Sequence, residues 1–230
     1  MPILEIITSS GFGSLLGMRH ALEPDHLAAV STLVSRERSS MKAAFLGVCW
    51  GLGHTFTLLL VGVGLVVLRS EMAASVSDAF EFLVALMLIG LGLRAILQAA
   101  QQGADGPMHV HRHGRVVHTH TGTPSHVHIG TWTLARRPLI VGAIHGLAGS
   151  GALTALVLTT LPTTAARLSY MTLFGLGSTV SMAALSGLLG WPLARLGTNQ
   201  AVVRGITLLV GCMSTALGVF WGYSAASRLL

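Results

Sequence analysis

Apolar residues form six long stretches along the chain, and shorter polar segments separate them. A helix that rises about 1.5 Å per residue needs about 20 apolar residues to cross the hydrocarbon core of a bilayer, and each stretch is near or above that length. The pattern therefore predicts an all-α fold, a polytopic bundle of six transmembrane helices. The predicted helices cover approximately residues 3–34, 43–68, 76–100, 139–161, 168–189 and 202–226.

One long polar stretch lies between the third and fourth predicted helices and divides the chain into two halves. We expect a first three-helix repeat at residues 1–102, a polar cytoplasmic loop at 103–137 and a second three-helix repeat at 138–230. Because each half has an odd number of crossings, the second half would lie upside down relative to the first, as inverted repeats.

Two short motifs support a relation between the halves. Gly17-Met-Arg-His20 is echoed by Gly142-Ala-Ile-His145. The segment Trp50-Gly-Leu-Gly-His54-Thr55 is echoed by Phe174-Gly-Leu-Gly-Ser178-Thr179, at nearly the same offset. Chance similarity among glycine-rich apolar helices is the alternative explanation.

Composition and charge narrow the class further. Of 230 residues, 52% are apolar and only 10% are charged, whereas a soluble domain has about 25% charged residues, so a water-soluble fold is excluded. The net charge of +6 is spread over several loops, so we expect the lipid bilayer and not nucleic acid as partner. Nine basic residues follow the first, third and fifth helices and three lie on the opposite side. This bias predicts a multi-pass protein of the bacterial inner membrane with both termini outside the cytoplasm.

Ionisable residues interrupt the first apolar stretch, which reads Arg19-His20-Ala-Leu-Glu23-Pro24-Asp25-His26. Such residues are costly inside a membrane and indicate function. Pro24 has no N–H for the carbonyl of His20, so it predicts a break that leaves this carbonyl free. Arg19 and Glu23 have the spacing of an ion pair within one helix, which would leave Asp25 as the carboxylate available to a metal.

Imidazole and carboxylate together suit nickel, cobalt and zinc. On an unbroken helix His20 and His26 would lie about 9 Å apart along the axis, so either the kink brings them together or they serve successive positions on a path. His54 lies at a similar depth in the second helix and is predicted to be a third ligand rather than a helix contact. Possible further ligands or path residues are Glu23, His145, Ser178 and Thr179.

Seven of the eleven histidines lie in the central polar segment, where they alternate with other residues: His109, His111, His113, His118, His120, His126 and His128. A histidine-rich tract binds transition metals by composition alone. This segment is polar and glycine-interrupted, so it need not fold without metal. We expect it to capture, buffer or regulate metal, and a spacer with incidental affinity is the alternative.

His20, four intervening residues, Asp25 and His26 match the His-x4-Asp-His signature, and the chain here resembles the nickel/cobalt transporter (NiCoT) family. Leu52-Gly53-His54-Thr55 is similar to a second signature of that family. Familiar members have eight helices with the first signature on the second. Here the first signature lies on the first helix, and in this respect the chain resembles a shorter, UreH-like branch of the family that has six helices and lacks the leading helix. The segment from Phe174 to Met182 lacks the acidic residues of a third signature.

The resemblance implies a permease for Ni²⁺ or Co²⁺, without an organic cofactor, in which His20, Asp25, His26 and His54 pass the ion. Uptake is the expected direction, and efflux is the alternative because related exporters also carry a histidine-rich cytoplasmic loop. A metallochaperone or a maturation system for a metalloenzyme such as urease or hydrogenase is the expected partner. The chain has no phosphate-binding loop, so the membrane potential, an ion gradient or a partner must supply energy.

Two other functions are weaker matches. Six helices and Ala148-Gly149-Ser150-Gly151 loosely resemble a rhomboid serine protease, but the last predicted helix has no histidine to act as the base for Ser150. A haem protein with two imidazole ligands is the third possibility. Neither accounts for Asp25 beside His26 or for the histidine-rich segment.

Overall fold

Within the residues that it describes, the computed structural model contains seven helices and four short strands. The backbone is described for residues 2–35, 37, 39–68, 70–101, 109–113, 116–120, 126–129, 132–161, 163–196 and 199–229, and the side chains for 11–35, 37, 39–68, 70–101, 135–149, 157, 161, 163–192, 195 and 199–229. The helices are α1 (Pro2–His20), α2 (Pro24–Val34), α3 (Ser40–Leu68), α4 (Ala74–Gln101), α5 (Arg136–Thr160), α6 (Thr164–Leu196) and α7 (Gln200–Leu229). The strands are β1 (His109–His113), β2 (Val116–His120), β3 (His126–Ile129) and β4 (Trp132–Ala135).

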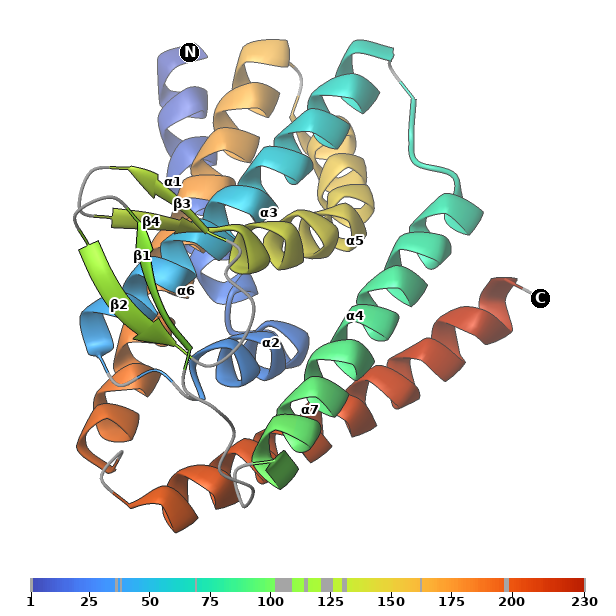
Figure 1. Ribbon diagram of the computed structural model, residues 1–230. Coiled ribbons are helices and arrows are strands. Elements are labelled where there is room, and N and C mark those ends of the chain that lie inside the picture. Colours follow the sequence, from blue (N-terminus) through green and yellow to red (C-terminus); the bar gives the residue numbers. More distant parts are fainter. Residues whose placement is uncertain are drawn as a thin grey trace.

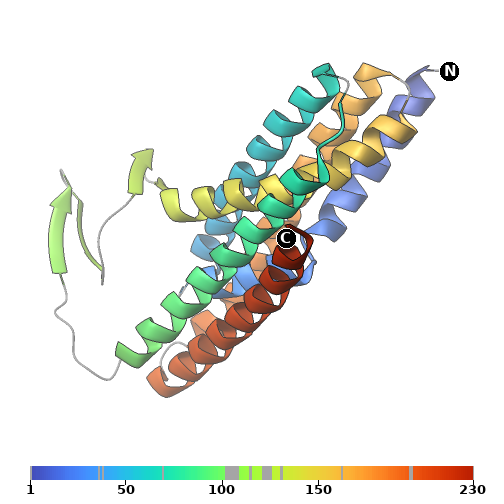
Figure 2. The same ribbon diagram turned by 90° about the vertical axis from the view of Figure 1, so that its right-hand side faces the viewer.

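The helices form one group of four and one pair, with a short helix between them. α3 packs against both α5 and α6, and α1 packs against α6. α4 and α7 run side by side along most of their length, as Figures 1 and 2 show. The short α2 lies between the group and the pair and contacts α4, α6 and α7. Residues on α2 are therefore surrounded by both parts of the protein.

In the part of the chain that the structure describes, four helices are long and apolar enough to cross a membrane: α3, α4, the Thr164–Pro192 part of α6, and α7. Their outward faces carry large apolar side chains, such as Phe56 at 67% exposure and Leu60 at 63%. Water would not favour such a surface, and lipid would. The prediction of a helical membrane protein is confirmed at this level.

The first predicted helix is interrupted, as Pro24 indicated. α1 ends at His20, and α2 begins with Pro24 at its first position, where a missing N–H costs nothing. The expected free carbonyl of His20 is wrong, because the N–H of Glu23 donates to it at 3.0 Å. A three-residue turn thus satisfies this backbone oxygen and changes the direction of the chain.

The polar segment between α4 and α5, which by its composition need not fold without metal, contains four short strands in the structure. β1 pairs with β2 and β3 pairs with β4, both antiparallel, with His109 opposite His120 and His111 opposite His118. Alternation with period two is the pattern of a strand, so the spacing of the histidines carried this signal. The seven histidine side chains of the segment lie outside the described side chains.

Glycines set the close approach of α3 and α5. A Cβ on Gly142 would overlap the carbonyl oxygen of Trp50. We expect Gly142→Val to destabilise the protein by about 1–3 kcal/mol, the usual cost of overpacking, measured as a lower thermal unfolding temperature in detergent. Gly64→Val is the matched control, because a Cβ on Gly64 meets nothing within 4 Å. Equal melting of the two variants would contradict this packing.

Candidate metal centre

The first ligand-type side chain, His20, is the last residue of α1. Its Nδ1 lies 3.0 Å from a carboxylate oxygen of Glu23, in the turn that follows. A neutral imidazole that donates its Nδ1–H to this carboxylate keeps its lone pair on Nε2. Glu23 thereby turns the ligating nitrogen of His20 toward the interior of the helix group.

Asp25 and His26 lie in the first turn of α2. The N-terminus of a helix carries partial positive charge and favours a carboxylate there. One oxygen of Asp25 lies 3.0 Å from Nδ1 of His26, and the other lies 2.6 Å from Nε2 of His145 on α5. All three side chains are buried. Asp25 is thus a buried charge that two imidazoles satisfy, which offsets the cost of removing it from water.

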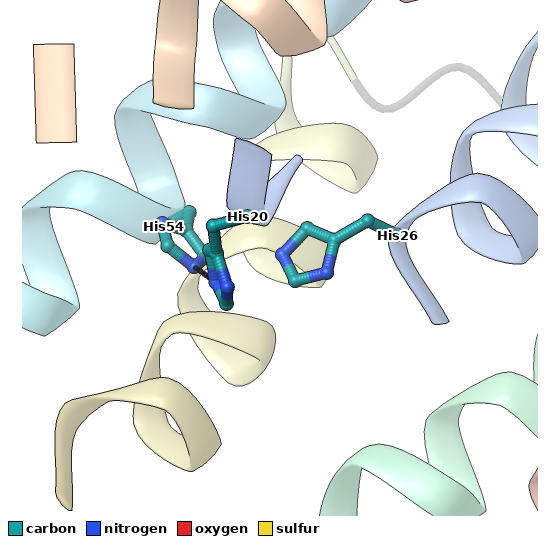
Figure 3. A group of neighbouring side chains, drawn as sticks. All are labelled: His20, His26 and His54. Atoms are coloured by element: carbon teal, nitrogen blue, oxygen red, sulfur yellow. Dashed lines mark hydrogen bonds between the residues drawn. The ribbon is translucent and has the colours of Figure 1, made fainter. Parts of the chain in front are cut away.

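Four imidazoles from four helices form one cluster. The ring centroid of His26 lies 4.4 Å from that of His20, 4.0 Å from that of His145 and 5.4 Å from that of His54. Nε2 of His20 lies 3.4 Å from Nε2 of His54, on α3. Figure 3 shows the rings of His20, His26 and His54 pointing toward one another from their separate helices.

Several ring nitrogens in the cluster have no hydrogen-bond partner among the described residues. They are Nε2 of His26, Nδ1 of His54 and Nδ1 of His145, all buried. A buried polar atom without a partner is costly unless something else binds it. The side chains offer two groups of ligand atoms, and within each group the atoms lie within 4.8 Å of one another. One group is His20, His26 and His54, and the other is Asp25, His26 and His145. Converging imidazole nitrogens with one carboxylate suit a divalent transition metal.

Comparison with known proteins identifies the family. The model of the family NicO, high-affinity nickel-transport protein, matches residues 7–222 of the chain.

The chain belongs to this family.

Relatives support the assignment. Urease accessory protein UreH of Bacillus sp. (strain TB-90) is 33% identical over 224 residues, which are 97% of this chain and 93% of UreH. Two Arabidopsis thaliana proteins, Chloroplast protein FOR GROWTH AND FERTILITY 2 and 1, are 26% and 28% identical over 81% and 80% of this chain. The matched part is about half the length of these two plant proteins, 48% and 50%. No solved structure matches the chain.

Membership in the NicO family confirms the resemblance seen in the signatures, and it confirms a transporter of nickel or cobalt rather than an enzyme. The rhomboid alternative fails for this reason. The side chain of Ser150 lies outside the described side chains.

The structure brings together the four residues of this NicO protein that the sequence predicted as its principal metal ligands. These are His20, Asp25, His26 and His54, and they lie in the cluster. The break after His20 brings the rings of His20 and His26 together, which is the first of the two arrangements that the sequence allowed. Glu23 contacts His20, and no ion pair between Glu23 and Arg19 occurs among the described side chains, so that expected pair is wrong.

The hydroxyl candidates of α6 have other surroundings. Oγ1 of Thr179 lies 2.9 Å from Oγ1 of Thr55 and also bonds the carbonyl of Gly175. Oγ of Ser178 is buried and has no partner among the described residues.

The sequence left the role of His145 open between a path ligand and a packing residue, and its bond to Asp25 places it within the cluster. Two aromatic residues were not predicted at the site. The ring centroid of Phe174 lies 5.3 Å from that of His20, and the ring centroid of Trp50 lies 5.6 Å from that of His26. Both occupy the same position in the two echoed motifs, which was the available signal.

Proposed function

We propose that this protein takes up Ni²⁺, or Co²⁺, across the bacterial inner membrane, and that His20, Asp25, His26 and His54 bind the ion during transport. The observation that carries the proposal is the convergence of α1, α2, α3 and α5 on one buried group of imidazoles and one carboxylate. His54 is near the middle of α3, a helix long enough to cross a membrane. An ion in this cluster would therefore be held deep in the bilayer.

Alternating access by two inverted three-helix repeats is part of the proposal. Reciprocal contacts support it: a Cβ on Gly17 would overlap the carbonyl oxygen of Phe174, and one on Gly142 would overlap that of Trp50. Gly17 corresponds to Gly142, and Trp50 to Phe174, in the echoed motifs. Each half thus presents the same glycine to the same position of the other half, as a two-fold relation requires.

The contact between α3 and α6 supports the same relation. Thr55 and Thr179 are counterparts in the echoed motifs, and their hydroxyls bond each other. A residue that meets its own counterpart lies at the two-fold axis. Movement of the halves about this contact would expose the cluster first to one side and then to the other.

The remaining parts of the proposal concern orientation and partners. Both termini face outward, and the histidine-rich segment faces the cytoplasm, where the nickel is passed to a metallochaperone or to the maturation of an enzyme such as urease. The name of UreH, a urease accessory protein, supports this destination. Inward movement of a divalent cation would gain about 2.3 kcal/mol per charge for each 100 mV of membrane potential.

The histidine-rich segment is expected to assist transport without being required for it. Deletion of residues 108–128, which removes His109, His111, His113, His118, His120, His126 and His128, is expected to lower nickel accumulation by about 2- to 5-fold, because capture from solution slows while the membrane site remains. Accumulation of radiolabelled nickel in cells measures this. Complete loss after the deletion would place the essential metal site in this segment.

Flux of radiolabelled nickel and cobalt in proteoliposomes tests the function as a whole. Purified protein is reconstituted, and the metal gradient is imposed in each direction with an inside-negative or inside-positive potential. We expect faster flux toward the negative side and saturation with nickel. Equal flux in protein-free liposomes would reject the transport function. Flux only toward the side of the membrane on which the N- and C-termini lie would assign efflux.

A further inference from the structure

The histidine cluster contains two overlapping groups of ligand atoms that share one residue. The first group is His20, His26 and His54, and the second is Asp25, His26 and His145. Within each group the ligand atoms lie within 4.8 Å of one another. His26 belongs to both, and its ring lies between that of His20, at 4.4 Å, and that of His145, at 4.0 Å.

We propose that the transported ion occupies two positions in succession, an entry position at His20, His26 and His54 and an inner position at Asp25, His26 and His145, with His26 as the ligand common to both. This inference rests on the proposed function, because it assigns a path to the ion that the transporter carries.

The two ring nitrogens of His26 face different partners. Nδ1 lies 3.0 Å from a carboxylate oxygen of Asp25, whereas Nε2 is buried and has no hydrogen bond to any described residue. The ring points toward His20 and His54 (Figure 3). An ion at the entry position binds Nε2 of His26 while the Nδ1–H of the same ring remains on Asp25.

In the structure, Asp25 accepts one N–H from His26 and one from His145. An ion at the inner position takes the place of these two protons between Asp25 and the rings. Each neutral imidazole then carries its one proton on its other nitrogen, Nε2 of His26 and Nδ1 of His145. Both nitrogens are without partners among the described residues. Each ring changes tautomer and keeps one proton, so the transfer releases none. The carboxylate of Asp25 is a direct anionic ligand, which the entry position does not have, and this favours movement of a dication inward.

Accessibility differs between the two positions and sets their order. The side chains of His20 and its partner Glu23 are 14% and 51% exposed. Those of His26 and His145 are 1% exposed, and that of Asp25 is 8% exposed. His20 is thus the most exposed of the ligands, because the other two entry ligands, His26 and His54, are 1% and 0% exposed. An ion would reach the entry position past His20, and the inner position has no ligand as exposed as His20.

The alternative is one site that uses all four imidazoles together, and two variants distinguish the models. His54→Asn removes a ligand from the entry position only, and His145→Asn removes one from the inner position only while keeping an N–H for Asp25. X-ray absorption of bound nickel(II) counts the imidazoles in each purified full-length variant. We expect three imidazoles in His145→Asn, but two imidazoles and a carboxylate oxygen in His54→Asn.

Transport provides the second measurement. Both variants are expected to bind one nickel ion, yet flux in proteoliposomes should fall at least about 10-fold in each, because the ion can reach only one of its positions. Three imidazoles in both variants, or wild-type flux in His145→Asn, would overturn the two-position path. Failure of the wild-type protein to bind or move nickel would instead reject the proposed function.

Discussion

Replacement of His26 by alanine is expected to abolish nickel accumulation, with flux reduced at least about 100-fold. His26 lies at the centre of the cluster, within 5.4 Å of the ring centroids of His20, His54 and His145. Loss of an orienting partner alone typically costs 10- to 100-fold in metal affinity, and loss of the central ligand should cost more. Initial rates of radiolabelled nickel uptake into proteoliposomes measure the effect.

The control for His26→Ala is the neighbouring Leu27→Ala. Leu27 is on the same helix but is 36% exposed, away from the buried cluster, so we expect near wild-type flux. Both variants must show the wild-type elution profile in detergent. Wild-type uptake by His26→Ala, together with wild-type uptake after deletion of residues 108–128, would refute the assignment of a histidine metal path.

Substitution of Asp25 by asparagine is expected to weaken nickel binding by about 10- to 100-fold while the fold is kept. The amide has the shape of the carboxylate but no charge, and it accepts through only one of its two polar atoms. In the structure, the carboxylate of Asp25 accepts a hydrogen bond from His26 and another from His145. The asparagine amide brings no negative charge to a divalent cation, and its NH₂ must face one of the two rings, so a metal ion loses the anionic oxygen of Asp25.

Asp78→Asn makes the same chemical change at a remote position. A carboxylate oxygen of Asp78 lies 2.6 Å from Nε of Arg228 at the contact between α4 and α7. Loss of the Asp78 charge should leave nickel affinity within about 2-fold of the wild-type value, because the exposed pair is screened by solvent. Isothermal titration with nickel(II) on both purified variants gives the comparison. Equal affinity of Asp25→Asn and the wild-type protein would remove the carboxylate from the binding mechanism.

Much of the membrane character and of the site chemistry could be predicted from the sequence. Long apolar stretches are a strong signal because a bilayer demands a minimum length of helix. The sequence from Arg19 to His26 was informative for a similar reason, since ionisable groups inside such a stretch are costly. Pro24 gave the position of the helix break because proline cannot continue the hydrogen bonding of a helix.

Other features depend on contacts between distant parts of the chain. The bond between His145 and Asp25 joins residues 120 positions apart, and no local pattern determines which helices meet. Glu23 was assigned to Arg19 from helical spacing, but the helix ends at His20, so the spacing rule does not apply there. The hairpins of the central segment were missed because the alternation of its histidines was noted without being interpreted as the period of a strand.

The choice of donor atoms also bears on which ions the cell must keep out. Four of the five side chains in the two groups of ligand atoms offer nitrogen, and only Asp25 offers oxygen. Magnesium and calcium prefer shells of oxygen, and magnesium gives up its bound water reluctantly. Alkaline-earth ions would therefore find too few acceptable ligands in this cluster, so the cluster itself would discriminate against them in favour of nickel without a separate filter.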